Sequence, residues 1–401
     1  MKSRTNQTDL KRPLYSRRRF LKTAVGAAGA AACAPMFLPG RALGKQRPLK
    51  LGYLPITDAT PLLVAHGLGY FAQEGLTVER PVMVRSWKIL TESFLAGKFN
   101  LTHMLFPIPV WMRFKQRVPV KVLAWDHTNG SAVTVKGDSG IDRFGDLGGK
   151  QVAVPSWYSM HNLLMQLGLQ TQGLTPVIRP QSAHLEPHEV NLFILPPPDM
   201  PTALLGNKID AFIVADPFNA LAQIKFNAKI MRYSGDIWKN HPCCVIVTHE
   251  DLIRQDSVMV QKAVNAIVRA QAWCIKNPNE TAHLLSRDGE GYLPVPEKVL
   301  KKVFAPPLPS ELRHPQWNVS RIGFQPYPFP SATRFIVDQM KKTLVEGNTD
   351  FLAGLDSGAA TAELVDNSFV SKAMDDMGGI RTFCDCDMEK PFTREEIVEI
   401  N

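Results

Sequence analysis

The chain has 401 residues, of which 45% are hydrophobic and 21% charged, so it can bury one large core or two medium ones. Its formal charge of +9 would suit a nucleic acid or an acidic surface. However, residues 1–44 contain nine Lys or Arg and one Asp, which gives them +8 and leaves +1 for the rest. The bulk charge of the body therefore argues for neither DNA nor membrane binding.

The first predicted segment, residues 1–44, is an export signal. Ser16-Arg17-Arg18-Arg19-Phe20-Leu21-Lys22 precedes an apolar, Ala- and Gly-rich run over residues 23–38. The pattern resembles a twin-arginine signal peptide, with cleavage expected after Gly44. A basic membrane anchor, or lipid attachment at Cys33, is the alternative, although the run is too short to span a bilayer. Since the twin-arginine route carries folded proteins, we expect the body in the periplasm.

Cysteine use predicts neither a disulfide framework nor a metal site. Five cysteines remain after cleavage, an odd number, and folding before export makes disulfides unnecessary. Cys384 and Cys386 stand in one short loop, where two thiolates provide only half of a metal site. We therefore expect free thiols with an occasional disulfide, and no metal or cofactor, at Cys243, Cys244, Cys274, Cys384 and Cys386.

A strand followed directly by a helix opens the body. Residues 50–56 alternate as a short strand does, and a helix is predicted to continue to Gly75. Thr57 or Asp58 is expected to cap that helix, with Pro61 in its first turn. The carboxyl end of such a strand offers free N–H groups to a small anion. Further strands are predicted at 77–83, 101–105 and 120–127, with helices at 86–97 and 107–117 and a turn at 128–131.

A second set of elements follows the same order and ends in a helical region. This alternation predicts an α/β fold with parallel sheets in two lobes and a cleft between them. Residues 45–130 are assigned to lobe 1, 131–234 to lobe 2, and 235–401 to lobe 1 and a helical C-terminal extension. The predicted strands are 151–155, 191–195, 211–215, 229–233 and 243–248, and the main helices are 160–172, 200–207, 258–276, 278–286, 296–304 and 331–346.

Common enzyme motifs are absent from the sequence. It contains no phosphate-binding loop with Lys and Ser/Thr, no Gly-x-Ser-x-Gly and no His-Glu-x-x-His. His184 and His188 have the spacing of two ligands on a helix, but Pro187 between them argues against that helix. The sequence therefore predicts a binding protein and not an enzyme.

Three side chains at predicted element ends are candidates for an anion site. Trp87 stands at a helix start, where an indole N–H can donate to an anion. His161 lies in the first turn of the helix that follows strand 151–155. Lys239, at the predicted return between lobes, can supply a full positive charge. On position alone, packing or solvation is the alternative for each.

An ordered series of short motifs resembles the nitrate/bicarbonate-binding periplasmic proteins of ABC importers. These belong to a wider group that binds nitrate, sulfonates, taurine and thiamine precursors. The series covers nearly all of the mature chain and comprises Leu51-Gly52-Tyr53, Thr57-Asp58-Ala59, Gly69-Tyr70-Phe71-Ala72, Ser86-Trp87, Thr102-His103-Met104-Leu105, Pro107-Ile108-Pro109, Pro196-Pro197-Pro198-Asp199-Met200, Asp210-Ala211-Phe212, Asp216-Pro217-Phe218-Asn219-Ala220, Gly235-Asp236-Ile237-Trp238-Lys239-Asn240-His241-Pro242 and Ala270-Gln271-Ala272-Trp273-Cys274.

The resemblance implies a two-lobed type II periplasmic binding protein with a hinge. It would act as a monomer, close on a small oxyanion such as nitrate, nitrite or bicarbonate, and deliver it to a permease and its ATPase. The family's ligand-binding Trp, His and Lys fall on Trp87, His161 and Lys239. Its Gln falls in the turn 128–131, where this chain has Asn129 or Ser131, and the shorter side chain leaves room for a larger anion.

Other residues are expected to line the cleft, and other ligands fit the resemblance. A carboxylate at the cleft lip opposes an anion unless it caps the helix, and we expect Asp58 to cap it. The alternatives are a sulfonate, taurine or thiamine-precursor ligand, an anion-sensing subunit, or an enzyme of the same fold. The expected cleft residues are Thr57, Asp58, His103 and Asp216.

Overall fold

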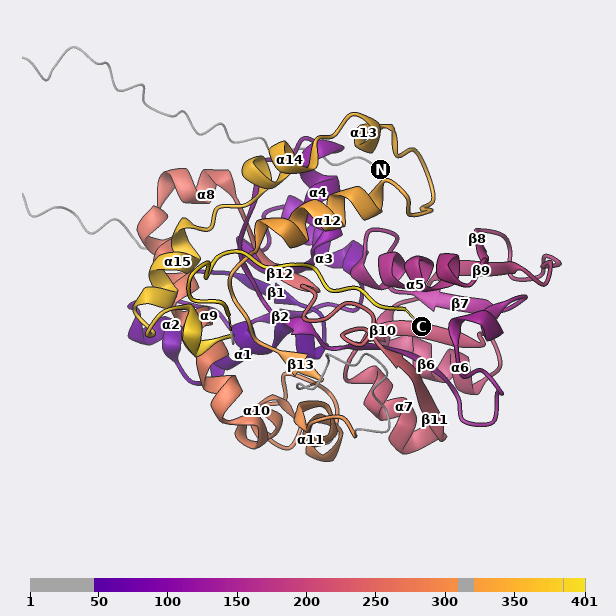
Figure 1. The fold of residues 1–401 in the computed structure, drawn as a ribbon. Helices are drawn as coiled ribbons and strands as arrows, with labels where there is room; N and C mark the ends of the chain where they lie inside the picture. The colour runs from indigo at the N-terminus through magenta and orange to yellow at the C-terminus, as the bar shows by residue number, and fades with distance from the viewer. Residues whose placement is uncertain (1–46, 309–320, 385, 401) are drawn as a thin grey trace, which may run out of the picture. The chain divides into compact units, whose positions relative to one another are not determined.

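Two β-sheets made from separate stretches of the chain organise the computed structural model (Figure 1). It describes residues 47–308, 321–384 and 386–400. The predicted export signal and Cys33 lie outside these residues. None of the described helices is long and apolar enough to cross a membrane.

The first sheet has the strand order β2–β1–β3–β12–β4. β1 is parallel to β2 and β3, whereas β12 runs antiparallel to both β3 and β4. The expectation of a purely parallel sheet is therefore wrong, because the chain returns from the second sheet and inserts β12 in the opposite direction. As a result β12 begins at the edge where β1, β3 and β4 end. The strands are β1 (Leu51–Tyr53), β2 (Val82–Met83), β3 (Leu101–Leu105), β4 (Val120–Trp125) and β12 (Cys244–His249).

The second sheet has the order β11–β6–β10–β7–β9–β8, and it is also mixed. β6 is antiparallel to its neighbours β10 and β11, and the other pairs are parallel. Both sheets belong to one compact unit, Arg47–Asn401, and the division into two lobes stays a prediction. The strands are β6 (Ser131–Lys136), β7 (Gln151–Val154), β8 (Thr175–Val177), β9 (Glu189–Ile194), β10 (Ala211–Ala215) and β11 (Ala228–Tyr233).

Two connecting segments join the sheets, residues 126–130 and 234–243. The first was expected to be a simple turn, but it contains β5 (Thr128–Asn129), which pairs with β13 (Ile322–Gly323). The second is paired with the C-terminal segment, because the N–H of Lys239 donates to Ile397 O and that of Glu399 to Ile237 O. The end of the chain thus holds the second connection in place.

Polar caps begin several of the helices that cover the sheets. The side chain of Ser86 accepts a hydrogen bond from Ile89 N, and that of Ser159 from Asn162 N. The long helix α9 packs against α1, α2 and α15, so the predicted helical C-terminal region is confirmed. The helices are α1 (Thr60–Gly67), α2 (Tyr70–Gln73), α3 (Trp87–Leu95), α4 (Pro107–Phe114), α5 (Met160–Thr171), α6 (Met200–Leu205), α7 (Phe218–Phe226), α8 (Glu250–Gln255), α9 (Ser257–Lys276), α10 (Pro278–Leu285), α11 (Glu297–Phe304), α12 (Pro330–Met340), α13 (Asp350–Ala353), α14 (Ser357–Leu364) and α15 (Ser368–Asp375).

The start of the first helix differs from the prediction. A 3₁₀ turn, Thr57–Ala59, precedes α1, and the chain breaks again at Gly69, whose φ of 70° lies in the left-handed region. No side chain caps α1, so the expected capping role of Asp58 is wrong. Thr57 and Asp58 are fully buried and do not lie at an exposed lip.

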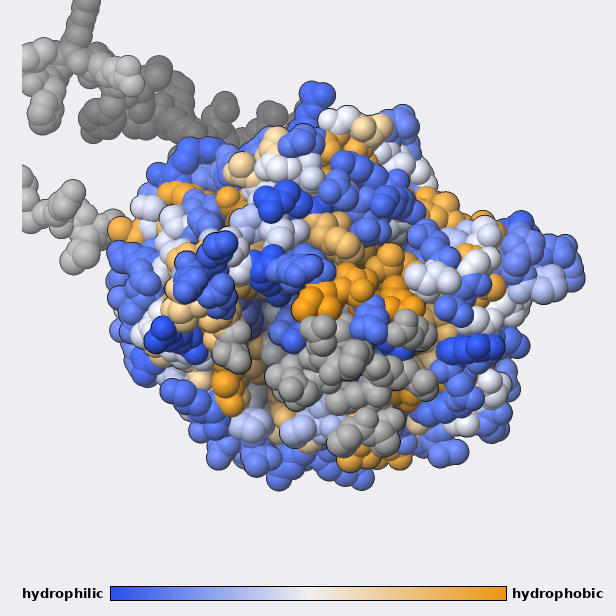
Figure 2. Space-filling model, viewed as in Figure 1, coloured by the Kyte–Doolittle hydropathy of each residue, from blue (hydrophilic) through white to orange (hydrophobic). Residues whose placement is uncertain are grey.

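The face of the protein shown in Figure 2 is mainly hydrophilic, with hydrophobic residues gathered near its middle. The hydrophobic core continues through both sheets and the helices on them. Buried ionisable side chains stand out against this background, because an isolated charge is costly to remove from water.

Candidate functional site

A buried polar cluster lies at the edge of the first sheet where β1, β3 and β4 end. Asp58 follows β1, and His127 follows β4. Cys243 and Cys244 stand at the beginning of β12, which the antiparallel topology brings to the same edge. All four side chains are fully buried. Four residues from three separate segments of the sequence thus meet in the interior.

One carboxylate oxygen holds this cluster together. Oδ2 of Asp58 lies 3.0 Å from His127 Nε2, and it accepts hydrogen bonds from the Cys243 and Cys244 thiols at 3.5 and 3.2 Å. Burial alone would raise the pKa of Asp58, but the neighbouring His127 lowers it below its usual value. Burial would also lower the pKa of His127, but Asp58 raises it well above its usual value. The two side chains therefore form a buried ion pair.

A second buried pair extends the cluster toward α3. His103 in β3 accepts a hydrogen bond from Leu54 N at Nε2, 3.1 Å away, so its proton is on Nδ1. Nδ1 lies 3.9 Å from Asp126 Oδ2. Burial lowers the pKa of His103 to about 3 and raises that of Asp126 well above its usual value. The His103 ring is therefore neutral at pH 7, and the indole of Trp87 packs on it with the ring centroids 5.4 Å apart.

The second sheet and its helix α5 contribute His161. Ser159 caps α5 and fixes the position of this first-turn residue. His161 Nε2 is hydrogen-bonded to Ser131 Oγ at 2.8 Å, whereas its buried Nδ1 has no partner among the described residues. Burial lowers the pKa of His161 to about 4, so the ring is neutral at pH 7. With the serine hydroxyl donating to Nε2, Nδ1–H is a free donor.

Ser131 connects His161 to the four-residue cluster. Its Oγ lies 3.9 Å from Cys243 Sγ. Ser131 is the first residue of β6, which follows the connection between the sheets. The serine hydroxyl thus bridges the second sheet and the beginning of β12.

Asn129 adjoins the cluster, whereas no contact places the Lys239 side chain there. Asn129 is buried with φ of 58°, and its Nδ2 donates to Asn240 Oδ1 at 3.3 Å. A Cβ on Gly235 would lie 2.6 Å from Asn129 Cγ, so this approach requires glycine. Lys239 precedes Asn240, but its side chain is partly exposed and its backbone N–H bonds to the C-terminal segment.

Thr57 and Asp216 join the two sheets without presenting a free polar group. The N–H and Oγ1 of Thr57 donate to the carbonyl oxygen of Asp216 at 2.7 and 3.0 Å. The Asp216 carboxylate accepts two bonds from Arg321, at 2.5 and 2.8 Å. Since that carboxylate is already paired, we assign Asp216 to the wall of the site.

A cavity of about 380 Å³ lies between the sheets beside the cluster. Trp111 of α4 stacks on Tyr158 before α5, with centroids 5.6 Å apart. Arg85, which follows β2 of the first sheet, and Asp199, which follows β9 of the second sheet, form an ion pair of 3.0 Å. Trp87 lines this cavity as well as contacting His103. The other lining residues are mainly apolar: Ser86, Lys88, Thr91, Glu92, Leu95, Ile108, Trp111, Pro155, Ser156, Tyr158, Ile194 and Pro196.

Sequence reasoning did not identify the centre of this cluster. His127 was not singled out, and Cys243 and Cys244 were expected to be ordinary thiols. The available signal was the position of these residues, at the end of one predicted strand and at the start of another. That signal becomes informative only when β12 is known to run antiparallel and begin at the same edge. Asp126 was missed for the same reason.

A family model described as the NMT1-like family matches residues 43–286. The chain is 29% identical over 253 residues to the nitrate/nitrite binding protein NrtA of Nostoc sp. (strain PCC 7120), which covers 58% of this chain and 54% of that protein. It is 28% identical over 249 residues to the bicarbonate transport ATP-binding protein CmpC of Synechocystis sp. (strain PCC 6803), covering 58% and 35%. The chain thus spans about half or less of the length of these curated relatives.

The three-dimensional arrangement is similar to the crystal structure of the periplasmic nitrate-binding protein NrtA from Synechocystis PCC 6803. The TM-score is 0.70 with 18% identity, and the match covers 86% of this chain and 97% of that chain. The fold is therefore that of the periplasmic binding proteins, and the predicted fold class is confirmed.

Proposed function

The chain belongs to the NMT1-like family, and from this premise we propose that it is the extracytoplasmic solute-binding component of an ABC importer. It captures a small oxyanion, nitrate, nitrite or a bicarbonate-like ion, between its two sheets and delivers it to a permease driven by an ATPase. The names of the relatives, which are binding and transport proteins, support this function over an enzymatic one.

The observation that carries the proposal is the meeting of polar groups from both sheets at one buried site. His161 comes from the second sheet's helix α5, and it connects through Ser131 to Cys243 at the edge of the first sheet. A ligand between these elements would be surrounded by protein and removed from water. Hydrogen bonds to a charged ligand are strong in such surroundings, and a missing donor is costly.

The site offers donors suited to a monoanion. If the Ser131 hydroxyl donates to its Nε2, the neutral His161 ring presents Nδ1–H, and the indole of Trp87 packs beside His103. Asn129 supplies an amide at the connection between the sheets. Lys239, in the adjacent segment, would supply the full positive charge once its partly exposed side chain turns toward the ligand. The Asp58 carboxylate is paired with His127 and therefore does not oppose an anion as an isolated charge would.

We also propose that the chain is exported by the twin-arginine route and acts as a monomer in the periplasm. The Ser16–Lys22 motif supports that route, because it resembles the signal at nearly every position. Replacing Arg17 and Arg18 by Lys is expected to leave the protein in the cytoplasm. Cell fractionation measures this, and unchanged export of the variant would contradict the route.

A thermal-shift screen of the purified chain tests the ligand class. It covers nitrate, nitrite, bicarbonate, cyanate, taurine and alkanesulfonates, because a ligand that binds the folded state raises the melting temperature. We expect stabilisation by one or more of the small oxyanions. Stabilisation by alkanesulfonates alone would replace the oxyanion by an organic ligand, and stabilisation by none would contradict the proposal.

Two variants and a control connect the screen to the site. Trp87→Phe retains most of the ring but removes its N–H, and Lys239→Ala removes the charge. Each is expected to weaken anion binding at least about tenfold, or about 1.4 kcal/mol. Lys298→Ala, at an exposed lysine on α11, is the matched control and retains the affinity. Unchanged affinity in both site variants would contradict their assignment.

A further inference from the structure

We propose that Asp58, His127, Cys243 and Cys244 bind one transition-metal ion of the zinc class in tetrahedral coordination. This site is distinct from the anion donors assigned above, and its occupation does not depend on which anion the protein carries. Within residues 47–308, 321–384 and 386–400, these side chains make the one group of three or more His, Cys, Asp or Glu residues with the spacing of metal ligands.

The kinds of side chain in the group select the metal. Two thiolates, one imidazole and one carboxylate are all ligands that zinc accepts, and four protein ligands are typical of a closed, structural zinc site. Calcium and magnesium prefer oxygen ligands and would have only one carboxylate here. A mixed sulfur and nitrogen set in a tetrahedral arrangement therefore favours zinc or a similar borderline-soft ion.

The distances between the four ligand atoms are close to those of a tetrahedron. Zinc bonds of about 2.0–2.3 Å place neighbouring ligand atoms about 3.3–3.8 Å apart. Asp58 Oδ2 lies 3.0, 3.2 and 3.5 Å from the imidazole nitrogen and the two sulfur atoms. All four atoms lie within 4.8 Å of one another. Small side-chain movements, of a few tenths of an ångström, would open these contacts around an ion.

The orientation of His127 supports a shared ligand over a simple hydrogen bond. Its Nε2 lies 3.0 Å from Asp58 Oδ2, but the two atoms are not aligned for a hydrogen bond. Nδ1 of His127 and Oδ1 of Asp58 also have no hydrogen-bond partner in the described part of the chain. Buried polar atoms usually have such partners, and where they lack them an ion is one explanation.

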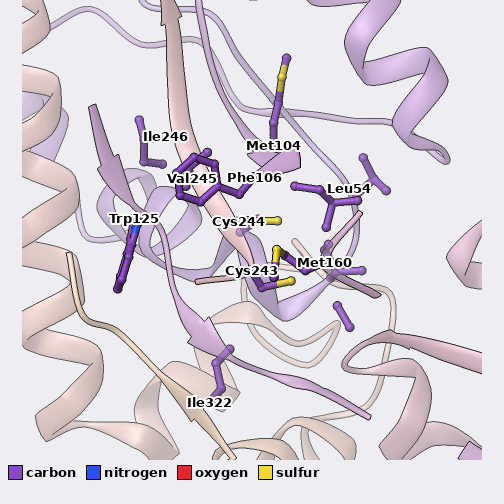
Figure 3. Packing of buried hydrophobic residues seen from close by; sticks show 14 of the residues in the cluster. Leu54, Met104, Phe106, Trp125, Met160, Cys243, Cys244, Val245, Ile246 and Ile322 are labelled. Carbon is purple, nitrogen blue, oxygen red and sulfur yellow. The ribbon is translucent and has the colours of Figure 1, made fainter. Parts of the chain in front are cut away.

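Backbone topology fixes the ligands before any ion binds. Cys243 and Cys244 are held by the start of β12, and Figure 3 shows their side chains together, with Leu54 and Met160 nearby. The apolar neighbours would exclude water and strengthen the bonds to an ion. His127 and Cys243 belong to the two segments that connect the sheets, so the ion would tie these connections to the end of β1.

The other thiols of the described chain are poor competitors for the ion. Cys384 and Cys386 form a disulfide with each other, and Cys274 is buried alone in α9. This leaves the adjacent Cys243 and Cys244 as the thiol pair that can bind a metal. It also provides control residues of the same type within the same protein.

Metal titration of the purified full chain tests the proposal. The protein is stripped with a chelator, kept under anaerobic conditions without a reducing agent so that the Cys384–Cys386 disulfide stays closed, and titrated with Zn²⁺ against a chromophoric chelator. We expect one ion per chain and a higher melting temperature. Co²⁺ is expected to give the near-ultraviolet absorption of cobalt–thiolate bonds. Absence of binding by the wild-type protein would overturn the proposal, even if an anion still binds.

Variants assign the ion to these ligands. Cys243→Ser/Cys244→Ser and His127→Gln are each expected to weaken Zn²⁺ binding at least about 100-fold, since even outer partners of a metal site change affinity by about 10–100-fold. Cys274→Ser and Cys384→Ser/Cys386→Ser are matched controls and retain the bound ion. A folded Cys243→Ser/Cys244→Ser variant with unchanged affinity would overturn the assignment. Should that variant not fold, His127→Gln and the Co²⁺ spectrum of the wild type decide it.

Discussion

The buried polar cluster and the cavity beside it lie next to each other between the sheets, yet their chemistry differs. The cluster contains ionisable side chains that are fully buried and mostly pair with one another. The cavity of about 380 Å³ has mainly apolar and aromatic walls, including Trp111 and Tyr158. Trp87 takes part in both, because it lines the cavity and packs on His103.

This difference indicates which region recognises charge and which provides space. An anion removed from water needs N–H donors, and we propose that the cluster side supplies them through His161, Asn129 and Trp87. The cavity walls offer apolar contact, which suits an organic group and contributes little to a small oxyanion. Binding of a small ion and of a bulky sulfonate should therefore depend on different residues, and the predictions below use that distinction.

The largest effect is expected from breaking the ion pair in the cluster. Asp58→Asn leaves the His127 charge buried without its partner, which typically costs about 3–5 kcal/mol. Chemical denaturation with a chelator present measures the free energy of unfolding. The double variant Asp58→Asn/His127→Gln removes both charges and should recover part of the loss. Equal losses in the single and double variants would contradict the buried ion pair.

A smaller loss of stability is expected when the pH is lowered. Burial lowers the pKa of His103 to about 3 in the folded protein, whereas the pKa of an unfolded histidine is near the ordinary value of 6.5. The contribution of His103 to stability is therefore complete above pH 6.5 and is lost as the pH falls toward 3. At pH 5 the loss is about 2 kcal/mol.

Comparison of His103→Gln with the wild type isolates the contribution of His103 to the pH dependence of the free energy of unfolding. The variant should lose about 2 kcal/mol less stability between pH 7 and pH 5, measured by denaturation at both values. His184→Gln, at an exposed loop histidine, is the control and should follow the wild type. An unchanged pH dependence in His103→Gln would show that His103 is not held neutral.

An effect on ligand choice is expected in the cavity. Trp111→Ala removes an aromatic wall and should weaken binding of any alkanesulfonate about tenfold, or about 1.4 kcal/mol, without weakening nitrate. The reason is that Trp111 is part of the apolar wall and makes no contact with the polar cluster in the structure described. Competition titrations with both ligand types measure this. Equal loss for both would contradict the separation of the two regions.

The smallest effect on stability is expected from the exposed ion pair between Arg85 and Asp199. Arg85→Ala removes the ion pair with Asp199, whose side chains are 69% and 49% exposed. Exposed pairs contribute about 0–1 kcal/mol, so stability should hardly change. The anion should dissociate somewhat faster in stopped-flow measurements if this pair helps to keep the two sheets together. A loss of stability well above that range would indicate a larger structural role.

Sequence patterns predicted local structure better than the centre of the site. β3 and β10 have the predicted bounds, because short apolar runs flanked by polar residues specify buried strands well. Trp87 and His161 were expected at helix starts, and the structure has both in the first turn of a helix. The role of Asp58 was not predicted, because its partners are 69 and more residues away and a local rule suggested a helix cap.

The remaining errors have a common physical origin. The direction of β12 depends on how the chain returns from the second sheet, and strand periodicity is the same in either direction. That direction brings Cys243 and Cys244 to the ends of β3 and β4. Ionisable residues that look solitary in the sequence thus become one buried cluster, and only the three-dimensional structure shows it.

Titration calorimetry with nitrate on the wild type and on His161→Ala tests the central claim most directly. The account predicts one nitrate per wild-type chain and at least about tenfold weaker binding by the variant, because the alanine removes the free Nδ1–H donor. Circular dichroism of both proteins verifies that the variant is folded. A folded variant with wild-type affinity, or a wild type that binds no nitrate, nitrite or bicarbonate, would contradict the account.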